Sequence, residues 1–337
     1  MSRFGYDQAA CLINLYNSYE VDDTITWYRR TEMPRAAKIS FINFKGGVAK
    51  TMTSVNFAAT LADRGYRVLL ADLDPQSNAS LWLLGEDRFP ARLDEPYRTV
   101  YQLFRDRLDG THHFRFNEAV VKTVAKDDRG HVVTPTLDLL PNTYHAVDLE
   151  DRLHVGQGNM DIFKLQMEDI QTQYDFMIFD CAPNLYLTTI NALLFSNYFI
   201  IPLYPDYFSR VGLIILCREV KRIWDRYGRF SGEDLELLGI LISRIKEGAT
   251  LDKGRKVDLE RGLKQLIEEG IVSPNAEMFE PYFNDSVEIP RSVEAFVPTI
   301  YYKRYDPRIK TYIDRMNEFA DVALGKIKTR FPDIVSK

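Results

Sequence analysis

Between the β-rich run Ile39-Ser40-Phe41-Ile42-Asn43 and a helical pattern that begins at Thr51, the sequence reads Lys45-Gly46-Gly47-Val48-Ala49-Lys50-Thr51. In the segment 51–63, four apolar residues recur at helical spacing: Val55, Ala58, Ala59 and Ala62. The order strand, glycine-rich loop and helix is the context that a phosphate-binding loop requires. An accidental Gly-Gly turn before a helix is the simpler alternative, but it does not explain why Lys50 and Thr51 occupy the positions that a phosphate-binding loop requires.

The loop predicts particular chemistry. Successive backbone N–H groups and the start of the following helix converge on phosphate oxygens. Lys50 then reaches the β and γ phosphates, and the hydroxyl of Thr51 ligates Mg²⁺.

Two further stretches end in carboxylates. Gly65 closes the first helix, and the apolar run 67–73 leads into Asp72-Leu73-Asp74-Pro75. The hydrophobic run Phe176-Met177-Ile178-Phe179 ends at Asp180. Carboxylates at the carboxyl ends of parallel strands face the crevice in which ligands bind. Taken alone, Asp74-Pro75 is equally typical of a strand-ending turn.

The remaining chain predicts an α/β fold with a mostly parallel, twisted sheet and helices on both faces. Several strands are continuously apolar, as in sheets covered on both sides. The expected strands are 137–140, 176–180, 198–203 and 237–242, and the expected helices are 101–108, 160–171, 185–195, 211–227, 257–267 and 307–328. We expect a helical arm at 1–35 and a single domain over 36–330, with an elaboration at about 89–136.

Composition sets limits on the function. Among 337 residues, 43 Lys+Arg against 48 Asp+Glu give a net charge of −5, so nucleic-acid binding needs a local basic patch. The three cysteines, Cys11, Cys181 and Cys217, form no C-x-x-C pair, which argues against a zinc knuckle and a disulfide framework. Cys181 is expected to be a small buried residue. No apolar run is long enough to cross a membrane, and we expect a cytoplasmic protein.

These segments resemble the deviant Walker A family of P-loop ATPases, and within it the ParA/Soj partition ATPases. The resemblance rests on the loop 45–51, on Val68-Leu69-Leu70-Ala71-Asp72-Leu73-Asp74-Pro75-Gln76-Ser77-Asn78-Ala79 and on Phe176–Asn184, and it extends over about 36–325. It implies that Lys45 crosses an ATP-sandwiched dimer to the partner's phosphates. It also implies that Asp74 orients or activates the attacking water, Asp72 supports the metal shell and Asp180 holds Mg²⁺. Without the resemblance, Lys45 is equally well explained as a solvated loop lysine.

The resemblance assigns catalysis to Lys45, Lys50 and Asp74, and the metal to Thr51, Asp72 and Asp180. The nucleotide would lie on Lys45, Gly46, Gly47, Val48, Ala49, Lys50, Thr51 and Met52. Two of these residues depart from the family pattern. Ala49 replaces a glycine, and its Cβ disfavours positive φ; Met52 replaces a threonine or serine.

The resemblance implies a slow Mg·ATPase that dimerises with ATP and binds DNA non-specifically, close to the nucleoid. It further implies a ParB-like or cargo-adaptor partner that stimulates hydrolysis, and a role in partition of plasmid or chromosomal DNA or in positioning a cargo. The candidate DNA contacts are Arg255, Lys256, Lys303, Arg304, Arg308 and Lys310, interleaved with Tyr301, Tyr302 and Tyr305. Packed tyrosines at the entrance of a solvated helix explain the same pattern.

Two other functions remain open. One is a nucleotide-gated binding module with negligible turnover, which Ala49 would permit. The other is a MinD-like positioning ATPase that binds a membrane through the apolar stripe of residues 307–328. We favour docking of that stripe on the protein's own domain, and therefore expect no membrane partner.

Overall fold

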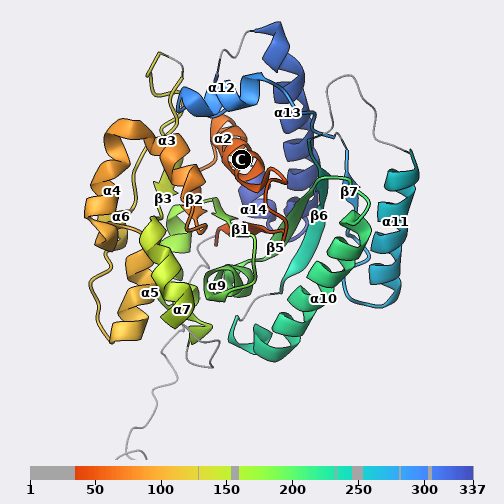
Figure 1. Cartoon of the computed structure of the whole chain (residues 1–337), viewed down its shortest axis with the longest axis horizontal. Helices are drawn as coiled ribbons and strands as arrows, with labels where there is room; N and C mark the ends of the chain where they lie inside the picture. The colour runs from red at the N-terminus through yellow and green to blue at the C-terminus, as the bar shows by residue number, and fades with distance from the viewer. Residues whose placement is uncertain are drawn as a thin grey trace, which may run out of the picture. The chain divides into compact units, whose positions relative to one another are not determined.

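Seven parallel strands form one sheet in the computed structural model, which describes residues 35–127, 129–152, 159–231, 234–244, 253–280, 282–302 and 306–336. Their order across the sheet is β3-β2-β4-β1-β5-β6-β7, and Figure 1 shows β3 and β7 at its two borders. The strands are β1 (Ala37–Phe41), β2 (Val68–Asp72), β3 (Leu137–Leu140), β4 (Phe176–Asp180), β5 (Tyr198–Leu203), β6 (Glu236–Ile242) and β7 (Met278–Phe279). The predicted α/β fold with a parallel sheet is confirmed.

Helices cover both faces of the sheet, so nearly every strand residue is buried (Figure 1). The helices are α2 (Lys50–Asp63), α3 (Asn78–Arg88), α4 (Pro90–Asp94), α5 (Val100–Asp109), α6 (Phe116–Ala119), α7 (Val147–Arg152), α8 (Ile162–Met167), α9 (Leu187–Phe195), α10 (Ser209–Tyr227), α11 (Lys253–Glu268), α12 (Glu288–Glu294), α13 (Pro307–Lys328) and α14 (Pro332–Val335).

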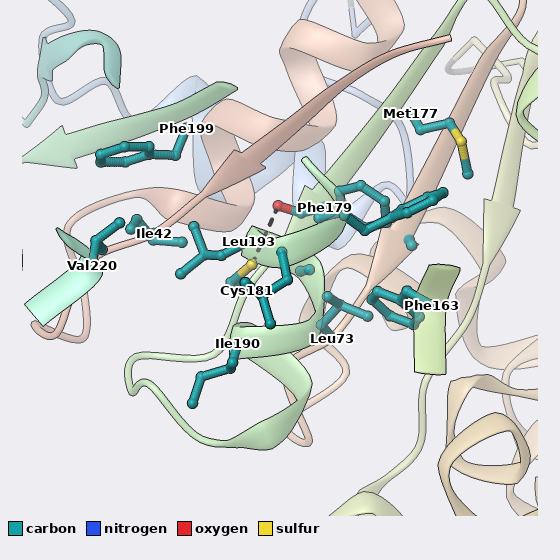
Figure 2. Packing of buried hydrophobic residues seen from close by; sticks show 14 of the residues in the cluster. Ile42, Leu73, Phe163, Met177, Phe179, Cys181, Ile190, Leu193, Phe199 and Val220 are labelled. Carbon is teal, nitrogen blue, oxygen red and sulfur yellow. Dashed lines mark hydrogen bonds between the residues drawn. The ribbon is translucent and has the colours of Figure 1, made fainter. Parts of the chain in front are cut away.

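The core lies in two layers, one on each face, because successive side chains of a strand point to opposite sides. In β4, Phe176 and Ile178 join the layer under α2 and α13, whereas Met177 and Phe179 join the layer under α9 and α10. Figure 2 shows the second layer, in which Phe163 packs against Phe179 at 5.6 Å between ring centroids.

Cys181 lies in that second layer and is fully buried (Figure 2). Its Sγ is 3.8 Å from the carbonyl oxygen of Phe179, and burial raises the pKa of its thiol. The prediction that Cys181 is a small buried residue is therefore confirmed. Cys217 is also buried, and Cys11 lies outside the described residues.

The sequence-based boundaries differ from the structure in a few places. The first strand ends at Phe41, because the Asn43 amide turns to the Pro202 carbonyl (2.7 Å) and begins the loop. The helix expected at 160–171 ends at Met167, because Gln171 bonds to the start of β1 with its backbone carbonyl and its side chain. The helices α3 and α12 and the short strand β7 were not predicted.

The elaboration at 89–136 builds α4, α5 and α6 and then returns to the sheet. Val121 exchanges two backbone hydrogen bonds with Leu139 in an antiparallel bridge, so the elaboration covers the outer edge of β3. Asp138 fixes this contact by accepting from Lys122 Nζ (2.8 Å) and the Thr123 N–H (3.0 Å). Of the expected arm at 1–35, only Arg35 lies within the described residues, and the domain boundaries stay a prediction.

The apolar stripe of α13 is part of the core. Ile309, Met316, Phe319 and Ile327 are buried, and the Phe319 ring lies 5.0 Å from that of Phe57 on α2. This contact confirms that the helix docks on its own domain. No helix in the described ranges is long and apolar enough to cross a membrane.

We predict that Gly239→Ala destabilises the fold. A Cβ at Gly239 in β6 would lie 2.4 Å from the Phe279 ring and 2.9 Å from the backbone oxygen of Glu277, so β7 would be pushed away. The free energy of unfolding should fall by about 1–3 kcal/mol in urea titrations. Gly325→Ala is the matched control: this exposed position in α13 has nothing within 4 Å of the new Cβ. Its stability should rise by about 0.5–1 kcal/mol. Equal stability of the two variants would contradict the close packing of β6 on β7.

Candidate functional site

The carboxyl ends of the central strands bring the predicted motifs to one edge of the sheet. In the strand register, Asp180 of β4 pairs with Phe41 of β1 on one side and with Asp72 of β2 on the other. The phosphate loop follows β1, and Asp74 follows β2. The structure therefore places the three motifs side by side at the edge where open α/β sheets bind ligands.

The loop is held by its carbonyl oxygens. Lys50 Nζ donates to the Lys45 oxygen (3.1 Å), Arg244 Nη1 to the Gly47 oxygen (2.8 Å) and Ser243 Oγ to the Val48 oxygen (2.9 Å). In a trans peptide, the C=O and the next N–H point in opposite directions. Each of these bonds therefore turns the following N–H away from the donor. Within the described part of the chain, the N–H groups of residues 46–49 donate to no acceptor, so they are free to bind an anion.

The backbone of the loop takes left-handed conformations at two residues. Gly47 has φ 72°, which glycine adopts freely. Ala49 has φ 67° and ψ 30° at the N-cap of α2. The sequence predicted that the Cβ of Ala49 conflicts with positive φ, and the structure shows that the residue nevertheless takes this conformation. The loop therefore carries backbone strain next to the start of the helix.

Lys50 and Asp74 lie close together in a largely buried setting, with exposed fractions of 7% and 8%. Burial lowers the pKa of Lys50, while the carboxylates of Asp180 and Asp74 raise it. Burial raises the pKa of Asp74; the Gln76 N–H, which donates to Asp74 Oδ1 at 2.9 Å, and Lys50 lower it. A buried ammonium can bind phosphate oxygens, and the two neighbouring carboxylates can bind a cation that accompanies the phosphate.

Asp180 offers a site for that cation. Its carboxylate is 1% exposed, and neither oxygen has a hydrogen-bond partner of ordinary geometry among the described residues. Burial raises its pKa, while the nearby hydroxyl of Thr51 lowers it. An unpartnered buried carboxylate beside a hydroxyl fits Mg²⁺, which takes one or two protein oxygens and completes its shell with phosphate and water. In agreement, no three His, Cys, Asp or Glu residues in the described ranges form a dedicated metal cluster.

Asp72 is engaged differently from the other acids. It is fully buried, and its Oδ2 accepts from Ser80 N (2.8 Å) and Ser80 Oγ (2.7 Å), while Oδ1 faces the Asp74 N–H at 3.2 Å. Burial and the charge of Asp180 raise its pKa well above the usual range. Its oxygens thus anchor the start of α3 and the turn that carries Asp74. These contacts favour an indirect role for Asp72, and its place in the metal shell stays a prediction.

Lys45 forms an ion pair within the chain. Its Nζ lies 2.8 and 2.6 Å from the two carboxylate oxygens of Asp206, in the loop after β5. Asp206 also accepts from Ser209 Oγ (2.7 Å) and the Phe208 N–H (3.0 Å). In this structure Lys45 is therefore held beside α10. Sequence reasoning missed Asp206, although a carboxylate directly after an apolar strand was a signal already used for Asp74 and Asp180.

An open, mostly apolar groove of about 570 Å³ runs beside the phosphate loop. It is lined by Gly47, Ala49 and Met52 from the loop and the start of α2, and by Asp285, Ser286, Val287, Ile289 and Pro290. Arg244, which follows β6, also lines it. The two residues that depart from the family pattern thus share one groove. Arg244 and Asp285 were not predicted, although a charged residue after a buried strand again marked Arg244.

The predicted DNA contacts do not form one free basic patch in the described residues. Arg255 donates to the Pro205 carbonyl (2.8 Å), and Lys256 lies 2.7 Å from Glu280. Lys310 is exposed on α13. Lys303, Arg304 and the Arg308 side chain lie outside the described part of the chain.

Of the two explanations left open for the tyrosines beside these cations, packing in the core holds for Tyr301 and Tyr302. Tyr301 is 2% exposed and donates to the Ala59 carbonyl (2.9 Å), and Tyr302 is 8% exposed. Both rings pack into the layer under α2 and cannot stack on bases. Tyr305 lies outside the described residues.

Comparisons with known proteins agree with this geometry. A family model described as an AAA domain matches residues 36–231. The chain is 31% identical over 291 residues to the sporulation initiation inhibitor protein Soj of Bacillus subtilis, covering 84% of this chain and 97% of Soj. Its structure is similar to that of the McdA–ATP complex of Cyanothece, with a TM-score of 0.63 and 18% identity over 87% of this chain and 97% of McdA.

A second solved structure is similar over part of the chain. Cobyrinic acid a,c-diamide synthase from Mycobacterium smegmatis, with a bound ATP analogue and magnesium, gives a TM-score of 0.52. It is 26% identical over 67% of this chain and 80% of that protein.

The strain at Ala49 can be measured. We expect Ala49→Gly to raise the free energy of unfolding by about 0.5–1 kcal/mol in denaturant titrations without ligand. Replacing a non-glycine residue in the left-handed region relieves about 1–2 kcal/mol of backbone strain. This gain exceeds the free-energy cost of the extra conformational entropy that glycine gives the unfolded chain. A less stable variant would mean that Ala49 does not hold positive φ in solution.

Proposed function

Because the chain belongs to the ParA/Soj family of ATPases, we propose that it binds ATP with Mg²⁺ on the loop 45–52 and acts as a nucleotide-dependent switch in partition or positioning. The observation that carries the proposal is the phosphate loop itself. The Gly47 and Val48 carbonyls are held by Arg244 and Ser243, and among the described residues the N–H groups at 46–49 and the nearby Asp180 carboxylate have no hydrogen-bond partner of ordinary geometry. The relatives with bound ATP or an ATP analogue support the same ligand.

Each side chain then has a distinct task. The N–H groups of the loop and the start of α2 bind the phosphates, and Lys50 neutralises their charge. Thr51 and Asp180 would hold the cation, which when bound would supply positive charge to offset the negative charge on the phosphates. The apolar groove beside Met52 takes the base, because it is open, adjacent to the loop and lined by aliphatic side chains.

We assign Asp74 to the attacking water. It lies after β2 with its Oδ1 fixed by the Gln76 N–H, in the same buried neighbourhood as Lys50. Burial with a fixed orientation is what a group needs in order to position a water molecule. Asp72 then acts through Asp74 by fixing the turn between them.

Dimerisation forms the second half of the proposal. In this structure Lys45 is paired with Asp206, where both side chains are more than a third exposed. Such an ion pair contributes little to stability, so Lys45 can leave it at small cost. We propose that a nucleotide on a second copy draws Lys45 across, because the phosphates carry more negative charge than one carboxylate.

DNA and a partner protein complete the switch. The chain's net charge of −5 gives no general attraction to nucleic acid, so joining two copies would have to double a local basic face that includes Lys310. A ParB-like or adaptor protein would then stimulate hydrolysis and release the DNA. The cargo is plasmid or chromosomal DNA, or a protein complex over the nucleoid.

Ala49 favours a second candidate, a nucleotide-gated binding module with negligible turnover. The strained loop has a Cβ where the family has none, directly at the phosphates. Binding requires the loop N–H groups and Lys50, whereas hydrolysis also requires accurate placement of the γ phosphate. The two candidates therefore differ in turnover and agree in binding.

Phosphate release separates these candidates. With ATP, Mg²⁺, DNA and the native partner, we expect Asp74→Ala to lower phosphate release at least about 100-fold while retaining an ATP-dependent dimer in light scattering. Asp87→Ala, on an exposed position of α3, is the control and should behave as the wild type. If the wild type releases no more phosphate than Asp74→Ala, the function is that of a binding module. A monomeric Asp74→Ala protein in ATP would contradict the switch.

A further prediction concerns Lys45. We expect Lys45→Ala to bind ATP as a monomer and to lose ATP-driven dimerisation, because it lacks the ammonium that reaches the second copy. Analytical ultracentrifugation with and without ATP measures both states. Lys264→Ala removes an exposed, ion-paired lysine from α11 and should dimerise normally. Unchanged dimerisation of Lys45→Ala would mean that Lys45 is a surface lysine with no role in the dimer.

A further inference from the structure

Arg244 has a backbone conformation that arginine rarely adopts. It follows β6 directly, with φ 61°. The preceding residue is fixed on both sides: Ser243 N donates to the Leu203 carbonyl at 2.9 Å, and Ser243 Oγ to the Val48 carbonyl at 2.9 Å. Left-handed conformations of bulky residues persist where the surroundings impose them, and they concentrate at functional sites. The conformation of Arg244 therefore indicates that its side chain has a role at this place in the fold.

The guanidinium of Arg244 joins two separate segments. Nη1 donates to the Gly47 carbonyl at 2.8 Å, and Nε lies 3.2 Å from Asp285 Oδ1. Gly47 belongs to the phosphate loop, and Asp285 to the segment that leads into α12. Both segments line the apolar groove.

The bond to Gly47 sets the direction of one particular N–H. Because the peptide between Gly47 and Val48 is trans and planar, holding the Gly47 oxygen toward Arg244 directs the Val48 N–H away from Arg244. The planar guanidinium has donors in a fixed fork, so Arg244 can fix this carbonyl and Asp285 at the same time. An ammonium of a lysine lacks this geometry.

We propose that Arg244 is a positioning residue for nucleotide binding, which clamps the phosphate loop to the segment that leads into α12, beside the base groove. The inference rests on the proposed function, since it assumes that the nucleotide occupies the loop and the groove. Arg244 thereby makes the phosphate end and the base end of the site one preformed unit. It acts through the Gly47 carbonyl and Asp285, and its effect is on affinity for the nucleotide.

Arg244→Gly separates this role from a purely structural one. Glycine accepts φ 61° without strain, and the lost ion pair has both side chains about half exposed, so thermal stability without ligand should not fall. Affinity for a fluorescent ATP analogue with Mg²⁺ should fall about tenfold, as expected for the loss of one charge-assisted hydrogen bond that organises the loop. Lower stability with unchanged affinity would overturn the proposal.

Arg244→Lys tests whether charge alone suffices. The lysine keeps the positive charge near the phosphates but cannot hold both acceptors, so we expect a similar loss of affinity. Wild-type affinity in Arg244→Lys would show that only the charge matters, and it would overturn the clamp. A double-mutant cycle with Asp285→Ala adds an independent readout. Asp285→Ala should weaken binding in the wild-type background and have no further effect in Arg244→Gly, whereas additive losses would contradict the coupling.

Two controls keep this inference distinct from the proposed function. Arg129→Gly removes the same side chain from an exposed turn of the elaboration, and it should bind the analogue as the wild type does. Lys50→Ala should abolish binding. If the wild type itself does not bind the analogue, the proposed function fails; if the wild type binds and Arg244→Gly binds equally, only the role of Arg244 fails.

Discussion

The planarity of the peptide bond is the constraint on which the site depends. A backbone carbonyl that is fixed on one side of a loop commits the next N–H to the other side. Lys50, Ser243 and Arg244 fix three such carbonyls, and two of these donors come from the end of β6, nearly 200 residues later in the chain. The sheet thus imposes on the loop a shape that the loop sequence alone does not specify. This dependence explains why the strand register matters for chemistry as well as for stability.

Much of the fold could be predicted because the strands are short, apolar and separated by helical patterns. Strands 137–140, 176–180 and 198–203 and helix 307–328 agree with the structure at both ends. Features that depend on distant partners could not be predicted. The two-residue β7 exists because it pairs with β6, and α8 ends early because Gln171 bonds to β1. A local pattern contains no information about such partners.

In the candidate site too, the residues with a local sequence pattern could be predicted and their distant partners could not. The phosphate loop, Asp74 and Asp180 were singled out because each lies at or soon after the carboxyl end of an apolar strand, and their roles came from the family resemblance. The partners of these residues were not found: Lys45 on Asp206, Asp72 on Ser80, and Arg244 on both Gly47 and Asp285. The sequence left two explanations open for the tyrosines at 301 and 302, because a run of aromatic and basic residues has the same composition on a surface and in a core. Only packing against α2 separates the two cases.

The elaboration that covers β3 has a consequence for how copies of this protein can meet. An open edge strand invites the backbone of another chain to extend the sheet, which is a common route to aggregation. Here the antiparallel bridge between Val121 and Leu139 occupies one edge, and the strand at the other edge, β7, is only two residues long. Among the described residues, neither border of the sheet offers a long template for strand addition. If two copies dimerise around the nucleotide as proposed, their contact would therefore come from side chains and the shared ligand and not from extension of the sheet.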